Sequence, residues 1–199
     1  MPRLYNYVLP LCIQFLFVYA GTACAPTEVD SVSEVQSYKS SEIRNNTLGA
    51  HNNVRKTVNV LKRNGWCKAP LAGGMRSNND LVIRMACIAN GESAFGRYTR
   101  GAVPGNNCIN RDYARGWWQI MPGCHVNKSA SYRGQTYTCP NVTPYTLGTN
   151  PDLNAQCALK VYVEAINRSY YNPFAPWEAK CAYGVEAEIA RLVGKYPCG

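Results

Sequence analysis

The chain has 199 residues, of which 46% are hydrophobic and 17% are charged, and its formal net charge is +9. This composition excludes an intrinsically disordered chain, because disorder needs low hydrophobicity and a high density of charge. The length indicates one domain, and the sequence has no glycine repeat or heptad repeat, which excludes the collagen and coiled-coil classes.

The first 25 residues have the pattern of a secretory signal peptide. Arg3 precedes an uncharged apolar stretch over 8–20, and small residues follow as far as Ala25. The stretch has about 13 residues, fewer than the roughly 20 that a membrane-spanning helix needs. We therefore predict a protein secreted to the extracellular or periplasmic space, with membrane contact only if Cys24 is lipidated.

A polar, serine-rich segment over 26–48 predicts a flexible linker or pro-segment before a globular domain at 49–199. Residues 51–199 contain 18 Lys or Arg against eight Asp or Glu, a net charge of +10. Such a basic domain favours anionic partners, for example nucleic acid, anionic lipid or an acidic wall polymer. No block of five or six basic residues occurs, so nucleic-acid binding is not expected.

The cysteines of the globular domain agree with export. Eight of the ten lie there: Cys67, Cys87, Cys108, Cys124, Cys139, Cys157, Cys181 and Cys198. Because exported proteins pair their cysteines, we predict that all eight form disulfides, in a connectivity that the sequence leaves open. No Cys-x-x-Cys pair occurs, and neither His51 nor His125 has a partner at metal-ligand spacing, so no metal or other cofactor is expected.

Periodicity, caps and helix breakers predict a mainly α fold with some β structure (α+β). The first predicted helix covers about 50–64, with Val54, Val58 and Leu61 on one stripe. The second begins at Asn79 or Asp80, the third runs from Asn150-Pro151 to about 170, and the last runs from Trp177 to about 193. Residues 96–115 are predicted to be loop or a short hairpin, and 127–149 to be a Ser-, Thr- and Tyr-rich loop. We therefore expect long disulfide-stapled loops and at most a small β hairpin.

The second predicted helix carries the most informative residue of the chain. Leu81, Met85, Ile88 and Glu92 recur at i, i+4, i+7 and i+11 and so share one helix face. The three apolar members predict that this face is buried, which places Glu92 at the end of a core-facing stripe. Burial raises the pKa of a carboxyl and lets it act as a general acid, but a buried ion pair with an arginine explains the same pattern.

The segments around this residue resemble a known family. Glu92-Ser93-Ala-Phe95, followed by Gly116-Trp-Trp-Gln119-Ile120, resembles the Glu-Ser-x-Phe and Gly-x-x-Gln-Ile pair of the lysozyme-like superfamily. Asn150-Pro-Asp-Leu-Asn154, with Ala158 and Tyr162, resembles a segment of the soluble lytic transglycosylases. Phe174-Ala-Pro-Trp177 resembles the Trp-bearing segment near the end of many lysozyme-like domains. The order of the segments matches as well, over about 80–185, which implies a lysozyme-like domain.

The resemblance implies that Glu92 is the catalytic acid and that the Gly-x-x-Gln-Ile segment lines a sugar groove. Tyrosine and tryptophan side chains suit such a groove, because their rings can stack on sugar faces. If 116–120 is extended, Trp117 and Trp118 point in opposite directions, and one of them faces the groove. The predicted substrate-binding residues are Ser93, Tyr113, Gly116, Trp117, Trp118, Gln119, Tyr145 and Tyr162.

A second catalytic carboxylate is the main open question. Animal c-type lysozymes carry an Asp just before the Gly-x-x-Gln segment, at the position of Ala114 here, and Asp112 stands two residues earlier. Asp112 either reaches the site as a nucleophile or cation stabiliser, or caps a turn. In the second case Glu92 works alone, as the resemblance to transglycosylases and goose-type lysozymes implies. We favour the single-carboxylate mechanism.

The expected function is cleavage of the β-1,4 bond between N-acetylmuramic acid and N-acetylglucosamine in peptidoglycan. The motifs do not separate a hydrolase from a lytic transglycosylase, and chitin or a deacetylated glycan is the alternative substrate. The alternative function is a non-catalytic secreted protein of the same fold that binds cell walls or chitin. The expected partner is therefore an amino-sugar polymer, and the chain is expected to act as a monomer.

Overall fold

The computed structural model describes residues 52–104, 113–168, 172–177 and 179–199, all of which belong to one compact unit, Ser41–Gly199. The predicted signal peptide, the predicted linker, Asp112 and Cys108 lie outside the described residues. Within the described ranges, no helix is long and apolar enough to cross a membrane.

Helices predominate, and the strands form two separate antiparallel pairs, β1 with β2 and β3 with β4. In chain order the elements are a helix over 52–63, the 3-10 helix η1 (Trp66–Lys68), α2 (Asn78–Ser93), β1 (Arg100–Pro104), β2 (Tyr113–Arg115), α3 (Pro122–His125), β3 (Lys128–Tyr132), β4 (Gln135–Cys139), α4 (Pro144–Thr149), α5 (Pro151–Asn167) and α6 (Val185–Lys195). The predicted mainly α fold with a small amount of β structure is confirmed. The limit of one hairpin is wrong, because there are two.

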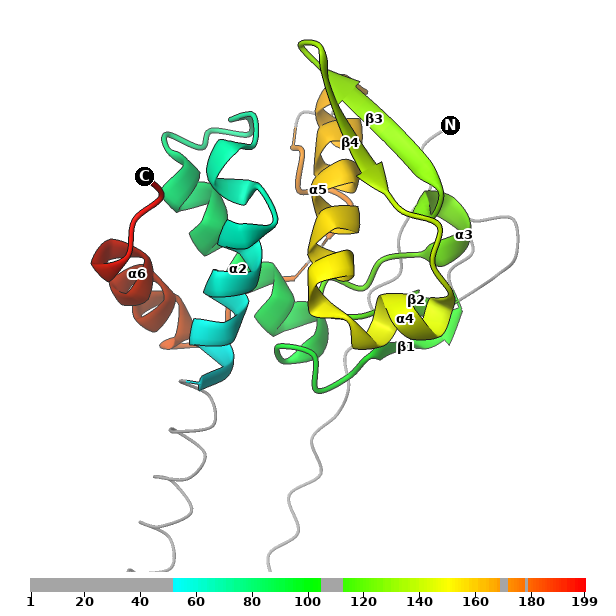
Figure 1. Cartoon of the computed structure of the whole chain (residues 1–199). Coiled ribbons are helices and arrows are strands. Elements are labelled where there is room, and N and C mark those ends of the chain that lie inside the picture. The colour runs from blue at the N-terminus through cyan, green and yellow to red at the C-terminus, as the bar shows by residue number, and fades with distance from the viewer. Residues whose placement is uncertain (1–51, 105–112, 169–171, 178) are drawn as a thin grey trace, which may run out of the picture. The chain divides into compact units, whose positions relative to one another are not determined.

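The elements pack around a core that lies between the helices. Helix α6 lies along α2, and the β3–β4 hairpin lies along α5 (Figure 1). Helix α4 packs against both α5 and β2. The largest fully buried side chains include Trp66, Trp118 and Tyr162, so aromatic residues from three segments fill the centre of this core.

The two N-terminal helices follow their predicted faces. Val54, Val58 and Leu61 are buried, and so are Leu81, Met85 and Ile88, which confirms both stripes. Helix α2 begins slightly earlier than predicted. Its cap is Ser77, whose hydroxyl accepts a hydrogen bond from the backbone N–H of Asp80, and such a cap satisfies an amide that the first helical turn leaves without a partner.

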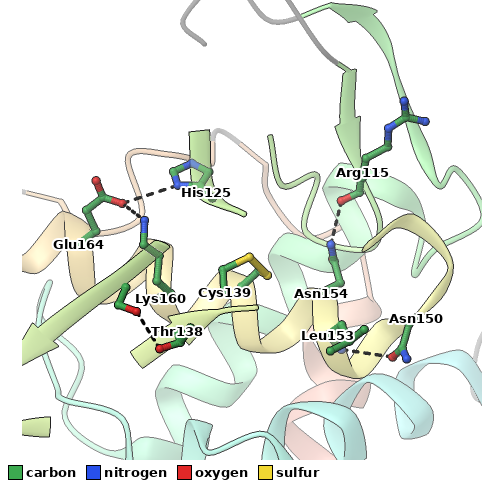
Figure 2. The surroundings of a disulfide bond; sticks show 11 residues. Arg115, His125, Thr138, Cys139, Asn150, Leu153, Asn154, Lys160 and Glu164 are labelled. Atoms are coloured by element: carbon green, nitrogen blue, oxygen red, sulfur yellow. Dashed lines mark hydrogen bonds and ion pairs between the residues drawn. A yellow bond between two sulfur atoms is a disulfide. The ribbon is translucent and has the colours of Figure 1, made fainter. Parts of the chain in front are cut away.

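The prediction of a loop over 127–149 is wrong, because strands β3 and β4 occupy much of it. They pair in an unbroken antiparallel register from Lys128 opposite Cys139 to Tyr132 opposite Gln135. The turn residues Arg133 and Gly134 both have positive φ, 48° and 83°, as tight hairpin turns require. The Cys139–Cys157 disulfide then fixes this hairpin to α5 (Figure 2).

The last helix begins at Val185 rather than at Trp177 as predicted. The segment before it runs beside α2, where the Cys87–Cys181 disulfide and a hydrogen bond from the N–H of Ala182 to Asn90 Oδ1 (2.9 Å) hold it. At Gly91 a Cβ atom would lie 2.6 Å from the carbonyl oxygen of Lys180, so only glycine permits this approach. Because these tertiary contacts hold the segment before Val185 against α2, it does not adopt the helix that its local sequence favours.

The predicted cysteine pairing is confirmed for the described cysteines. Disulfides join Cys67 to Cys198, Cys87 to Cys181 and Cys139 to Cys157, and Cys124 is disulfide-bonded as well. Disulfides are typical of proteins that fold in an oxidising compartment.

Candidate active site

Glu92 is the last residue but one of α2 and lies on the helix face of Met85 and Ile88. Those apolar side chains are fully buried, whereas Glu92 is half-buried, so the apolar face ends at a carboxylate that solvent still reaches. The predicted position of Glu92 at the end of a core-facing stripe is thereby confirmed. The helix ends at the next residue, Ser93, and the C-cap Ala94 adopts a left-handed conformation with φ 49°.

Ser93 connects the end of α2 to the turn over 116–119. It is buried, and its hydroxyl lies 2.9 Å from the carbonyl oxygen of Trp117 and 3.1 Å from that of Ala89. The same oxygen accepts a hydrogen bond from the N–H of Gly96 at 2.8 Å. These contacts with the backbone give Ser93 a positioning role and leave its hydroxyl engaged within the protein.

The Gly-x-x-Gln-Ile segment is a tight turn rather than an extended strand. Arg115 and Ile120 pair across it through two backbone hydrogen bonds of 2.9 and 2.8 Å. The turn needs left-handed residues at both ends, Gly116 with φ 76° and Gln119 with φ 45°. Alternation along a strand therefore does not apply, and both Trp117 and Trp118 are buried.

Two distant residues fix this turn in place. Asn154 on α5 accepts a hydrogen bond from the N–H of Trp118 at 2.9 Å. It also donates one to the carbonyl of Arg115 at 2.9 Å (Figure 2). The indole N–H of Trp177 donates to the carbonyl of Trp118 at 2.7 Å. With the contact from Ser93, all four segments that carry the family resemblance meet at one turn.

Gln119 and Tyr113 are the predicted groove residues that lie beside this turn. The amide nitrogen of Gln119 donates to the carbonyls of Tyr98 (3.1 Å) and Gly116 (2.7 Å), which fixes its side chain across the turn. Tyr113 begins β2 and is half-buried, with the guanidinium of Arg100 3.6 Å from the centre of its ring.

Three further predicted groove residues lie either in the core or on the outer surface. Trp118 is fully buried and donates its indole N–H to the carbonyl of Met85. Tyr162 is fully buried too, and its hydroxyl donates a hydrogen bond to the carbonyl of Pro70 at 3.0 Å. Burial raises the pKa of this hydroxyl to about 12. These two rings are core residues. Tyr145 on α4 is 78% exposed and lies on the surface.

A cavity with a volume of about 680 Å³ lies beside the end of α2, and no sequence motif indicated it. We name it the Trp117 cavity. Its lining includes Lys56, Asn90, Phe95, Arg97, Trp117 and Thr149, but not Glu92. Because α-helical residues advance about 100° each, Asn90 and Glu92 face nearly opposite sides of α2. The cavity and the carboxylate thus lie on different sides of the same helix end.

A second group of charged residues surrounds Glu164 on α5. Its carboxylate forms ion pairs with Lys160 and Arg168, both at 2.5 Å, and lies 3.6 Å from Nδ1 of His125. Figure 2 shows the contacts with Lys160 and His125. Burial favours the neutral carboxyl, but the hydrogen bond and charge of Lys160, together with Arg168, outweigh it and keep the pKa of Glu164 below its usual value. No group of His, Cys, Asp or Glu able to hold a metal occurs among the residues that the structure describes.

We expect His125 to make the fold less stable in mild acid. Burial, followed by the charge of Lys160, lowers its pKa from 6.5 to about 4 against the opposing effect of Glu164. As the pH falls, the unfolded chain therefore binds this proton first, and the free energy of unfolding decreases between pH 6.5 and 4. The shift corresponds to a loss on the order of 3 kcal/mol.

Urea unfolding at several pH values measures this loss. His125→Gln should flatten the decrease between pH 6.5 and 4, whereas His51→Gln, which removes the only other histidine, should leave it unchanged. An equal slope in the wild-type protein and in His125→Gln would contradict the assignment.

No family model matches this chain, and no curated protein or solved structure matches it either. Function is therefore inferred from the residues of the site.

Proposed function

We propose that this protein is a secreted enzyme that cleaves the β-1,4 bond between N-acetylmuramic acid and N-acetylglucosamine in peptidoglycan, with Glu92 as the general acid. One observation supports it most: four segments that resemble the lysozyme-like superfamily, far apart in the chain, meet at the turn over 116–119 beside the end of α2. Packing of the core alone would not require hydrogen bonds between these particular segments.

The proposed chemistry needs one proton donor. Glu92 gives its proton to the glycosidic oxygen as the bond from that oxygen to the sugar's anomeric carbon breaks, and the departing sugar leaves as an alcohol. The remaining sugar cation is stabilised by its own acetamido group, as the resemblance to transglycosylases implies. The Glu92 carboxylate then accepts a proton from the attacking oxygen, which belongs either to water or to the sugar's own hydroxyl.

The half-buried position of Glu92 suits this role. A buried apolar face ends at this residue, which is itself half-buried, so Glu92 lies at the boundary between the core and the surface. Gln119 and Tyr113 lie next to the same turn, where an amide and an aromatic ring can contact a sugar.

Clearing of a suspension of bacterial cell walls by the purified protein tests the proposal. Mass spectrometry of the released fragments then separates the two reactions, because reducing ends indicate hydrolysis and anhydro-sugar ends indicate transglycosylation. Binding to walls without release of any fragment would refute the enzymatic proposal and favour the non-catalytic, glycan-binding alternative.

Asp112→Asn should have only a mild effect on the rate of wall cleavage. If Glu92 works alone and Asp112 caps a turn, the change costs about 1 kcal/mol of stability and little activity. Initial rates of wall clearing and urea unfolding of the same preparation measure both quantities. A rate loss above about a hundredfold would instead make Asp112 a second catalytic carboxylate.

A further inference from the structure

The Trp117 cavity combines positive charge with hydrogen-bonding groups. Lys56 and Arg97 line it, and none of the described lining residues is Asp or Glu. Asn53, Asn90 and Thr149 add amide and hydroxyl groups. A cavity with cations, amides and no carboxylate favours an anionic, polar ligand.

Aromatic rings accompany both cations. The ammonium nitrogen of Lys56 lies 5.5 Å from the centre of the Trp117 ring, and the guanidinium of Arg97 lies 5.7 Å from the centre of the Tyr98 ring. Tyr98 is 59% exposed and stands in the chain between the lining residues Arg97 and Thr99. Rings beside cations are suited to a ligand that joins a sugar to an anionic group.

We infer that the Trp117 cavity is a second binding site, which holds an anionic group of a glycan polymer, a carboxylate or a phosphate, against Lys56 and Arg97. The inference that the ligand is a glycan rests on the proposed function, whereas the inference that it is anionic follows from the lining of the cavity alone. The site lies away from the cleavage position, because Asn90 lines the cavity and Glu92 faces nearly the opposite side of α2.

Trp117 belongs to both sites. Its ring lines the cavity, and its backbone carbonyl receives the hydrogen bond from Ser93, the neighbour of Glu92. An anionic polymer held in the cavity therefore anchors the protein to the wall, and Glu92 acts on another part of the strand.

Calorimetric titration of the oxidised mature protein tests this inference with three probes: muramyl dipeptide, which supplies a carboxylate, glycerol 3-phosphate, which supplies a phosphate, and uncharged chitobiose. We expect Lys56→Gln combined with Arg97→Gln to weaken binding of a charged probe by about tenfold or more. A control that removes two exposed cations elsewhere, Arg76→Gln with Lys195→Gln, should not weaken it.

The probes also identify the source of the anion. Preference for muramyl dipeptide assigns the cavity to the peptide stem of peptidoglycan, and preference for glycerol 3-phosphate assigns it to a phosphate polymer. The inference would be overturned if neither charged probe binds or if chitobiose binds as tightly as they do. It would also be overturned if the control pair of substitutions weakens probe binding as much as the Lys56 and Arg97 substitutions do. Glu92→Gln should retain probe binding, so a protein that binds the probes but cleaves no wall refutes only the proposed activity.

Discussion

Glu92→Gln should lower the rate of peptidoglycan cleavage by at least about 10²-fold and leave the fold intact. Glutamine has nearly the same size as glutamate, but its amide cannot give a proton to the departing oxygen, and general acid catalysis contributes about 10²–10⁴-fold to such rates. Because Glu92 is only half-buried, the neutral amide should be accommodated without a large loss of stability.

Initial rates of wall clearing measure this effect, with urea unfolding as the check on folding. Glu186→Gln provides the matched control, because it makes the same chemical change at an exposed position on α6. If Glu92→Gln keeps more than a tenth of the wild-type rate, Glu92 is not the general acid.

Gly116→Ala should lower the free energy of unfolding by about 2–4 kcal/mol. Part of this loss is the left-handed backbone at φ 76°, which costs an ordinary residue about 1–2 kcal/mol. The rest is overlap, because a Cβ atom at Gly116 would lie 2.4 Å from the side chain of Asn154, which also fixes the turn.

Two comparisons separate these causes in urea unfolding. Gly134→Ala has the same backbone problem at φ 83° with no atom near the new Cβ, so it should show the backbone cost alone. In an Asn154→Ala background, Gly116→Ala should become no more harmful than Gly134→Ala, because the overlapping atoms are gone. Equal losses for Gly116→Ala and Gly134→Ala in the wild-type background would show that Asn154 does not constrain this turn.

The helix faces were predicted correctly from the sequence, whereas the second hairpin was missed. The stripes of the first two helices follow directly from apolar spacing, and they hold in the structure. Polar and apolar residues alternate in both strands, as Ser-Ala-Ser-Tyr over 129–132 and Thr-Tyr-Thr-Cys over 136–139, and the apolar members are the less exposed ones, but each run is only four residues long. This hairpin depends on its packing against α5 and on the Cys139–Cys157 disulfide, which are contacts that local sequence does not encode. The Arg133-Gly134 turn between the two alternating runs is a further local signal for it.

The candidate site, like the fold, was predicted only in part. The motifs identified Glu92 and the Gly-x-x-Gln-Ile segment, but not the hydrogen bonds from Asn154 and Trp177 that hold this segment, since both residues are distant in sequence. The prediction for the two tryptophans assumed an extended segment, and it does not hold because Gln119 adopts a left-handed conformation. Glutamine rarely signals such a conformation, so nothing in the sequence pointed to the turn.

The Cys67–Cys198 disulfide joins two cysteines 131 positions apart in the chain, and every segment that meets at the turn over 116–119 lies between them. A protease that cuts one peptide bond anywhere inside this ring produces two fragments that remain covalently joined. Such a nicked molecule keeps Glu92, Asn154 and Trp177 in one particle, and it separates into pieces only when the disulfides are reduced. Outside the cell, where proteases are common and reductants are scarce, a single cut therefore need not end the working life of the molecule.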